Sequence, residues 1–331
     1  MRFLRRLILF LFLIIGGAAA GLFWFANNPL SLHGSKTLDF SISPGATLRS
    51  ASQQMSDAGV GFPAWQFTLL ARLLGKSAEI KAGSYELEQG ITPWLLLGKL
   101  TRGDVTQDEI VFVEGKTFRQ LRATLDAHTA LRHATAGLKD QEILVLINAS
   151  ERHPEGLFYP DTYLFAKNSS DLAVLKRAYR AMQQRLAAEW QHRDPRVPYA
   201  TPYEALIMAS IVEKETGRAE DRSAVSAVFT NRLRLGMMLQ TDPAVIYGVG
   251  EKFDGNLRKR DLQFDTPYNT YTRPGLPPTP ISMPGLASIQ VTLRPPKSDK
   301  LYFVARGDGT SEFSRNLDEH NRAVAKYQRG K

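Results

Sequence analysis

The chain has 331 residues, of which 43% are hydrophobic and 23% charged, with 42 lysines and arginines against 33 acidic residues and no cysteine. This ordinary globular composition excludes the collagen-like, wholly disordered and disulfide-stapled classes. The lack of cysteine also excludes thiolate nucleophiles and thiolate zinc sites. A chain of this length predicts about two domains.

The start of the sequence predicts a membrane anchor. Residues 7–26 contain no charged or strongly polar side chain, and the run is long enough to cross a bilayer as one helix. The alternative is a cleaved signal peptide, with the alanines at 18–20 as its cleavage site. We favour an uncleaved anchor, because the apolar run continues past those alanines to Trp24 and Phe25.

Basic residues predict how the anchor is oriented. Arg2, Arg5 and Arg6 lie before the span and no lysine or arginine follows directly after it, so residues 1–6 are expected in the cytoplasm. Residues 27–36 then form a linker to the external part. Removing three charges from the total of +9 leaves +6 on that part. These charges are dispersed, which argues against nucleic acid as a partner and leaves lipid headgroups, cell-wall polymers or a merely solvated basic surface.

A strand, turn and helix pattern occurs three times in residues 37–150, which we interpret as a small α+β region. Each copy joins its strand to its helix through Gly-X-Thr, where glycine supplies a positive φ and threonine caps the helix. The three turns are Gly45 to Thr47, Gly90 to Thr92 and Gly115 to Thr117. The pattern fits a wall-binding module of the LysM type, and it fits generic strand-to-helix turn chemistry equally well.

Periodicity predicts further elements along the chain. The expected strands are 39–43, 85–88 and 110–113. The expected helices are 48–55, 94–100, 118–125, 140–149, 171–192, 203–216 and 222–235. Residues 240–296 are rich in proline, glycine, tyrosine and asparagine, which predicts long ordered loops of the kind that line sites. We place the domain boundary at residue 150, so that a mixed helix and strand domain occupies 151–331.

The helix expected at 203–216 carries the strongest candidate chemistry. Its apolar body predicts a buried central position, and its last turn holds Glu213 and Glu215, where the helix dipole disfavours anions. The two glutamates are about 200° apart around the helix, so one of them can face a cleft. Burial there raises the pKa of a carboxyl, as a general acid requires. Alternatively, both are solvated charges near Arg218 or Arg222.

Polar and aromatic side chains gather in the loops that follow. Amide, hydroxyl and ring groups of this kind hold sugars by hydrogen bonds and by contact with the sugar faces, so they suit a glycan groove. The substrate-binding candidates are Gln240, Thr241, Asp242, Tyr247, Tyr268, Asn269 and Tyr271. The alternative is that the tyrosines are core residues whose hydroxyl groups reach water.

Together these motifs resemble the MltG (YceG-like) family of endolytic murein transglycosylases. The resemblance covers nearly the whole external chain in order. It rests on EGLFYPDTY at 155–163, ASIVEKET at 209–216, LQTDP at 239–243, YNTY at 268–271, GLPP at 275–278, LYFV at 301–304 and HN at 320–321. The family's single anchor and LysM-like module agree with the reading above. In one departure, Glu312 stands where the family pattern has histidine before Phe313, which leaves any role of that position open.

The resemblance implies a bacterial inner-membrane enzyme whose catalytic domain is periplasmic. Such an enzyme cuts peptidoglycan strands internally, between N-acetylmuramic acid and N-acetylglucosamine, and leaves 1,6-anhydro ends. The family's catalytic glutamate is the second of the Glu-Lys-Glu triplet, which is Glu215, and Asn321 joins the residues expected to bind substrate. The resemblance also implies proximity to peptidoglycan synthases and a role in ending strand elongation.

Two other functions remain open from the residues. One is a muramidase-type hydrolase in which Asp242 or Glu213 supplies a second carboxylate. The other is a non-catalytic wall-binding scaffold that uses the Gly-X-Thr repeats. We expect no cofactor and no metal, because the sequence has no nucleotide-binding glycine motif and its histidines lack metal-ligand spacing. The histidines are His33, His128, His133, His153, His192 and His320.

Overall fold

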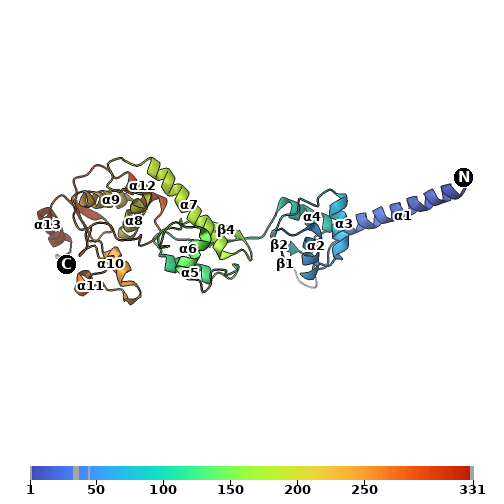
Figure 1. Cartoon of the computed structure of the whole chain (residues 1–331), viewed down its shortest axis with the longest axis horizontal. Coiled ribbons are helices and arrows are strands. Elements are labelled where there is room, and N and C mark those ends of the chain that lie inside the picture. The colour runs from blue at the N-terminus through green and yellow to red at the C-terminus, as the bar shows by residue number, and fades with distance from the viewer. Residues whose placement is uncertain (1, 33–36, 44, 329–331) are drawn as a thin grey trace. The chain divides into compact units, whose positions relative to one another are not determined.

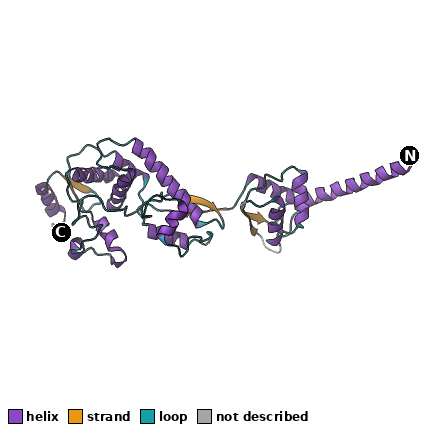
Figure 2. Cartoon of the chain, in the orientation of Figure 1, coloured by secondary structure: helices purple, strands orange, loops and turns teal. Residues whose placement is uncertain are grey.

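The computed structural model describes residues 2–32, 37–43 and 45–328. Its contacts divide the chain into two units. Unit 1 comprises Met1–Glu109 with Leu164–Ser169, and unit 2 comprises Ile110–Tyr163 with Ser170–Lys331. Helices predominate in both, together with short two-stranded sheets (Figures 1 and 2), which confirms the predicted α+β class.

Unit 1 is a small α+β body that follows a long N-terminal helix (Figure 1). Its elements are α1 (Arg2–Asn27), β1 (Thr37–Ile42), α2 (Leu48–Asp57), α3 (Ala64–Leu73), β2 (Gly83–Glu88) and α4 (Pro93–Arg102). Strands β1 and β2 are antiparallel, with Phe40 opposite Tyr85 and their rings stacked 5.5 Å apart. In α1, the segment Arg5–Asn27 is long and apolar enough to cross a membrane.

The chain between α1 and β1 differs from the linker expected there, because part of it packs into the core of unit 1. Leu30 and Leu32 are buried in the core of unit 1, and the Leu30 N–H donates a hydrogen bond of 2.8 Å to the carbonyl of Ile91. Apolar side chains at these two positions are buried for the usual hydrophobic reason. The rest of the expected linker, 33–36, lies outside the described residues.

The three Gly-X-Thr turns form as predicted. The threonine Oγ1 atoms accept hydrogen bonds of 3.2–3.3 Å from the backbone N–H groups of Ser50, Leu95 and Gln120. The glycines have φ between 72° and 94°, a region in which other residues are strained. The third turn, Gly115 to Thr117, belongs to unit 2, so the three copies do not form one module. The LysM-like interpretation stays a prediction.

The division between the units also differs from the boundary expected at residue 150. Strands β3 (Gln107–Val111) and β4 (Thr162–Ala166) pair, and the division falls within each of them. Residues 110–150 belong to unit 2 because their apolar side chains pack there. The ring of Phe118, for example, stacks on that of Phe158 at 5.0 Å.

Unit 2 is built around α8, as the sequence predicted. Residues 205–212 of α8 are all buried, and the helix contacts α7, α9, α10 and α12. The helices of unit 2 are α5 (Phe118–Asp126), α6 (Asp140–Ile147), α7 (Asp171–Gln191), α8 (Pro202–Glu215), α9 (Ala219–Arg234), α10 (Asp242–Val249), α11 (Lys259–Gln263), α12 (Leu286–Leu293) and α13 (Leu317–Tyr327). Its antiparallel hairpin consists of β5 (Tyr302–Ala305) and β6 (Ser311–Ser314).

The region expected to be loops, 240–296, holds three of those helices, and this expectation was therefore partly wrong. Helix α10 begins at Asp242 with proline in its first turn, where the missing N–H costs nothing. It ends at Val249 and is followed by Gly250, whose φ is +64°. Proline and glycine here mark the ends of short helices. Between α11 and α12 the chain does run as an irregular, ordered loop.

Candidate active site

Glu215 is the last residue of α8 and lines a cavity of about 560 Å³. Its Oε2 accepts a hydrogen bond of 2.9 Å from Thr241 Oγ1, which stands directly before α10. The cavity lies wholly within unit 2. The polar and aromatic side chains that line this cavity with Glu215 include Arg232, Gln240, Asp242, Tyr271, Tyr302 and His320. The predicted catalytic residue thus faces a cavity that can hold a ligand.

The surroundings of Glu215 favour its protonated form. Burial raises the pKa of its carboxyl to about 7, the hydrogen bond from Thr241 opposes the rise, and the charge of Asp242 adds to it. A carboxyl with such a pKa carries a proton in a large fraction of molecules at neutral pH, and its carboxylate is also accessible. Glu215 can therefore both donate and accept a proton under the same conditions.

Glu213 has a different position and a different partner. Its Oε2 accepts hydrogen bonds from the N–H of Gly285 (3.0 Å) and the hydroxyl of Ser288 (2.7 Å) at the start of α12. A carboxylate is favourable at a helix N-terminus, so this contact ties α8 to α12. Glu213 does not line the cavity of Glu215. Arg218 pairs with Glu220 (3.6 Å) instead of with Glu213 or Glu215.

Two loops are joined beside Glu215. The N–H of Thr241 donates to Thr270 Oγ1 (3.0 Å), and the N–H of Gln240 donates to the carbonyl of Thr270 (3.1 Å). The Tyr271 hydroxyl donates a short hydrogen bond of 2.6 Å to Asp242 Oδ1. Asp242 and Tyr271, both expected to bind substrate, are therefore held together on the wall of the cavity.

Gln240 and Arg232 complete this side of the cavity. Gln240 is exposed and has φ of +53°, an uncommon conformation for a residue other than glycine and one that concentrates at functional sites. Arg232 is buried, and its guanidinium donates to the carbonyls of Leu301 and Leu239, each at 2.7 Å. Arginine is almost never fully buried unless its charge has partners. In the sequence alone, nothing distinguished Arg232 from the other arginines of α9.

Another part of the cavity wall comes from the C-terminal hairpin and α13. The rings of Tyr302 and His320 stack at 5.2 Å, and both side chains line the cavity. Asn321, the expected substrate-binding residue, is exposed and lies outside the lining, whereas its neighbour His320 is in it. Glu312 lies on β6 and pairs with Arg306, which gives this departure from the family pattern a partner.

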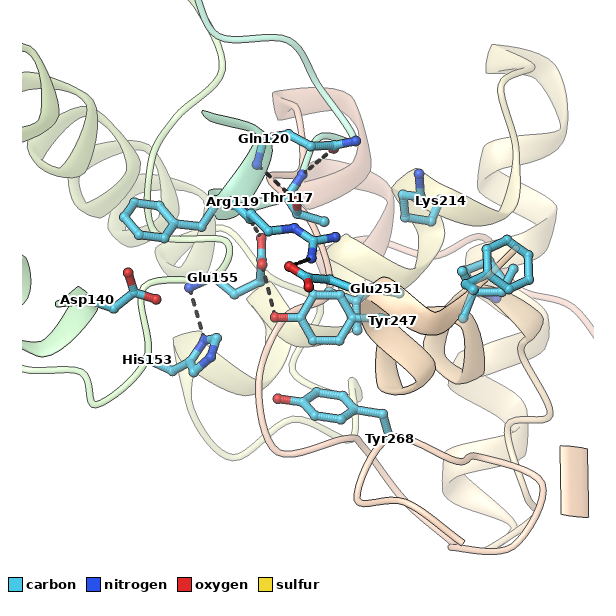
Figure 3. Close-up of a pocket in the computed structure, with 16 residues that line it drawn as sticks. Thr117, Arg119, Gln120, Asp140, His153, Glu155, Lys214, Tyr247, Glu251 and Tyr268 are labelled. Carbon is cyan, nitrogen blue, oxygen red and sulfur yellow. Dashed lines mark hydrogen bonds and ion pairs between the residues drawn. The ribbon is translucent and has the colours of Figure 1, made fainter. Parts of the chain in front are cut away.

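Tyr247 and Tyr268 line a second cavity, of about 620 Å³, with Glu155 at its base (Figure 3). Glu155 is only 3% exposed. Its carboxylate accepts hydrogen bonds from the Phe118 N–H (2.8 Å) and the Tyr247 hydroxyl (2.9 Å). Burial raises the pKa of Glu155 to about 7, which both hydrogen bonds oppose. In sequence Glu155 belonged to a motif without an assigned role.

Helix α10 and the end of α8 contribute to both cavities. Asp242 of α10 lines the first cavity and Tyr247, later on the same helix, lines the second. On α8, Glu215 lines the first cavity and the preceding residue, Lys214, lines the second (Figure 3). The two cavities are therefore neighbours on either side of these helix ends.

Asn269 and Thr241 are buried and line neither cavity. The Asn269 side-chain amide donates to the carbonyls of Leu262 (3.1 Å) and Phe264 (2.7 Å), and its oxygen accepts from the Tyr271 N–H (2.9 Å). Buried polar groups need such partners, and here they fix the loop that carries Tyr268 and Tyr271. Asn269 therefore positions the loop that carries Tyr268 and Tyr271. The substrate contact expected for its side chain is not seen, because Asn269 lines neither cavity.

Comparison with known proteins places the chain in a family. A model of the YceG-like family matches residues 40–326. An endolytic murein transglycosylase of Bacillus subtilis (strain 168) is 31% identical over 335 residues, which cover 95% of this chain and 91% of the relative. One from Streptococcus pneumoniae serotype 2 is 26% identical over 364 residues, which cover 99% of this chain and 66% of that relative.

A solved structure agrees with these relatives. The crystal structure of a YceG-like protein from Listeria monocytogenes superposes with a TM-score of 0.55 at 31% sequence identity, covering 87% of this chain and 99% of the other. The family match extends over both units of the fold and includes every residue around Glu215 described above. The chain therefore belongs to the YceG-like family.

Proposed function

We propose that this protein is a lytic transglycosylase that cuts peptidoglycan glycan strands internally, between N-acetylmuramic acid and N-acetylglucosamine. The observation that carries the proposal is Glu215, a carboxyl with a pKa of about 7 in a polar and aromatic cavity. Relatives named endolytic murein transglycosylase support it, one of them at 31% identity over most of both chains.

In the proposed reaction, the Glu215 carboxyl donates its proton to the glycosidic oxygen, and the bond between C1 of the muramic acid and that oxygen breaks. The C6 hydroxyl oxygen of the same sugar attacks C1, and its proton passes to the Glu215 carboxylate. The products are a 1,6-anhydro end and a new free hydroxyl on the leaving sugar. Because the nucleophile belongs to the substrate, proximity favours its attack, and Glu215 ends the cycle protonated as it began.

The residues beside Glu215 have supporting roles in this proposal. The carboxylate of Asp242 is near enough to affect the pKa of Glu215, so it can also stabilise positive charge that develops on the sugar ring. The Tyr271 hydroxyl fixes the position of Asp242. Gln240, exposed at the cavity, offers amide groups to sugar hydroxyls.

The glycan strand extends past the cleaved bond, and the second cavity offers it a place. Tyr247 and Tyr268 present an aromatic pair with ring centres 4.8 Å apart, a surface suited to the apolar faces of sugars. Thr117, Gln120 and Lys214 add hydroxyl, amide and ammonium groups around this pair. We therefore assign substrate contact to both cavities, with cleavage in the one that contains Glu215.

The rival hydrolase needs a second carboxylate beside the cleaved bond. Asp242 can supply it, because it shares the cavity of Glu215. Glu213 cannot easily do so, because its carboxylate is bound to the start of α12. Asp242 is therefore the remaining candidate for the second carboxylate of a muramidase. The two reactions differ in the origin of the new oxygen on C1, which is water in hydrolysis and the C6 hydroxyl in transglycosylation.

Reaction in water enriched in ¹⁸O tests the proposal. Transglycosylation takes the new oxygen at C1 from the C6 hydroxyl, so the anhydro ends gain no label and resist borohydride reduction. Hydrolysis places labelled oxygen on a reducing end. Labelled, reducible ends from the purified full-length protein would replace the transglycosylase with a hydrolase.

The proposal also includes a location. The helix α1 anchors the protein in the bacterial inner membrane, with residues 1–6 in the cytoplasm and unit 2 in the periplasm. Unit 1 binds the wall through its LysM-like region, where the residues that line a cavity of about 660 Å³ include Gln89, Gly90 and Lys99. There the enzyme acts close to peptidoglycan synthases and ends the growth of glycan strands.

A further inference from the structure

Unit 1 exposes a group of large apolar side chains on two neighbouring segments. Trp65, Leu69 and Leu73 lie at every fourth position of α3, with exposed fractions of 65%, 41% and 65%. Trp94 and Leu95, in the first turn of α4, are exposed by 53% and 56%. Side chains four apart on a helix share a face. We call these five residues the apolar face, and a group of exposed large apolar side chains of this kind marks an interaction surface.

The apolar face continues onto the anchor helix. Ala26 of α1 is buried in the core of unit 1, with Leu22 and Phe25 packed against that core, and α1 contacts both α3 and α4. A groove of about 580 Å³ runs along the junction. On the α1 side its lining extends from Ile15 to Asn27, and on the other side it includes Leu69, Leu73 and Trp94 of the apolar face.

The extent of this groove along α1 indicates how far it would reach into a bilayer that α1 crosses. An α-helix rises 1.5 Å per residue, so Ile15 lies about 16 Å along α1 from Ala26. The hydrocarbon core of a bilayer is about 30 Å thick, which is about the length of residues 7–26 as a helix. If this run spans the core, the groove extends to depths occupied by lipid.

We propose that unit 1 is seated on the outer surface of the membrane, with the apolar face inserted among lipid headgroups and the upper parts of the acyl chains. The occupant of the groove and of the face is lipid, because both are continuous with the helix that crosses the bilayer. The inference rests on the membrane anchor of the proposed function.

The composition of the apolar face matches a bilayer interface. Tryptophan is enriched at that depth, where its ring is apolar and its N–H reaches water, and the face has two tryptophans. Leu69 and Leu73 supply the apolar contact. Arg72 is exposed directly before Leu73 on α3, and its long side chain can place a guanidinium group among lipid phosphates. Unit 1 is then held by its helix and by its face, which fixes its orientation on the membrane.

The four tryptophans of the chain make a direct test. They are Trp24 on α1, Trp65 and Trp94 on the apolar face, and Trp190 on α7 of unit 2. The full-length protein is reconstituted in vesicles of phosphatidylethanolamine and phosphatidylglycerol, with or without bromine on the acyl chains. Bromine quenches tryptophan fluorescence at short range. One variant, Trp24→Phe with Trp190→Phe, leaves only the tryptophans of the apolar face.

Two matched variants calibrate the result. One keeps Trp24 alone and reports insertion of the anchor, and the other keeps Trp190 alone and reports the background. We expect brominated lipid to quench the face tryptophans nearly as strongly as Trp24, and well above Trp190.

Quenching of the face tryptophans no greater than that of Trp190 would overturn the proposal. If Trp24 is quenched in the same series, the anchor stands and only the seating of unit 1 fails; if Trp24 is also unquenched, both fail. A blue-shifted but unquenched emission from the face that weakens as protein is diluted in lipid would assign the face to a second copy of the chain, which also overturns a lipid contact.

Discussion

Glu215 and Thr241 are joined by a hydrogen bond of 2.9 Å between the end of α8 and the start of α10. The hydroxyl donates to the carboxylate, so it stabilises the charged form and lowers the pKa that burial raises. This hydrogen bond therefore affects both the position and the pKa of the proposed catalytic carboxyl.

Replacement of Thr241 by valine should raise the pKa of Glu215, because the variant keeps the shape of the side chain and removes the donor. The alkaline limb of the profile of kcat/KM against pH should then move to higher pH. Thr272→Val is the matched control, because the Thr272 hydroxyl donates to Asp265 on an exposed loop. An unchanged alkaline limb in Thr241→Val would show that this hydrogen bond does not tune the acid.

The wild-type pH profile follows from the proton that Glu215 must carry at the start of the reaction. Its pKa is about 7, so kcat/KM should be high below that pH and should fall as pH rises through it. Rates on uncrosslinked strands across this range test the prediction. A profile that increases through pH 7 would mean that Glu215 acts first as a base.

The two glutamates in the last turn of α8 should respond differently to the same change. Glu215→Gln removes the acid and should abolish cleavage while the fold remains. Glu213→Gln weakens hydrogen bonds from Gly285 and Ser288 to a charged group, so it should lower the free energy of unfolding by about 1.5–3 kcal/mol. Its chemical step should persist at temperatures where the variant is folded. Loss of cleavage in folded Glu213→Gln with retention in Glu215→Gln would exchange their roles.

The Asp242→Asn variant tests whether the Asp242 carboxylate only assists cleavage or is essential for it. The charge of Asp242 raises the pKa of Glu215, so its removal should shift the alkaline limb of activity to lower pH. Transglycosylation should be slowed but should still give anhydro ends. If Asp242 were instead the second carboxylate of a hydrolase, the variant would form no product at any pH.

Glu155 and Glu215 should make the protein less stable as pH rises from about 4.5 to 7. Both carboxyls have a pKa near 7 when folded, against 4.5 for the model group, so the folded state binds more protons between these values. Below pH 4.5 each carboxyl is protonated in both the folded and the unfolded state, so it does not lower the free energy of unfolding. Above pH 7 each carboxyl is ionised in both states, and the loss of unfolding free energy reaches about 3 kcal/mol per group.

Chemical denaturation at several pH values tests this dependence. Glu155→Gln should flatten part of the pH dependence, because an amide does not titrate. A wild-type stability that increases from pH 4.5 to 7, or a dependence that Glu155→Gln leaves intact, would contradict the role of these buried carboxyls.

Local chemistry explains how much of the fold the sequence could predict. The Gly-X-Thr turns were predictable because glycine and threonine act on their own backbone, and α8 was predictable because its apolar residues surround the whole helix. Helix α10 was missed because Asp-Pro reads as a turn until the rest of the helix is considered. Proline at a helix start and proline in a loop look alike over a few residues.

The site depends on contacts between segments that are far apart in the sequence, and local sequence patterns cannot predict such contacts. The role of Glu215 came from a motif, and its separation from Glu213 was foreseen from helix geometry. The bond from Tyr247 to Glu155 joins residues 92 positions apart, and neither residue type indicates the other. The sequence suggested Asn269 as a sugar ligand in a polar loop, but its side chain is hydrogen-bonded to backbone groups of α11 and of the loop that follows it.

The mass of the products tests the central claim most directly. Full-length protein in detergent is incubated with uncrosslinked peptidoglycan strands beside its Glu215→Gln variant, and the new ends are analysed by mass spectrometry. We predict internal fragments whose muramic ends are lighter by one water than hydrolysed ends, and no such fragments from Glu215→Gln. Fragments with hydrated reducing ends, or anhydro fragments from the variant, would contradict the mechanism.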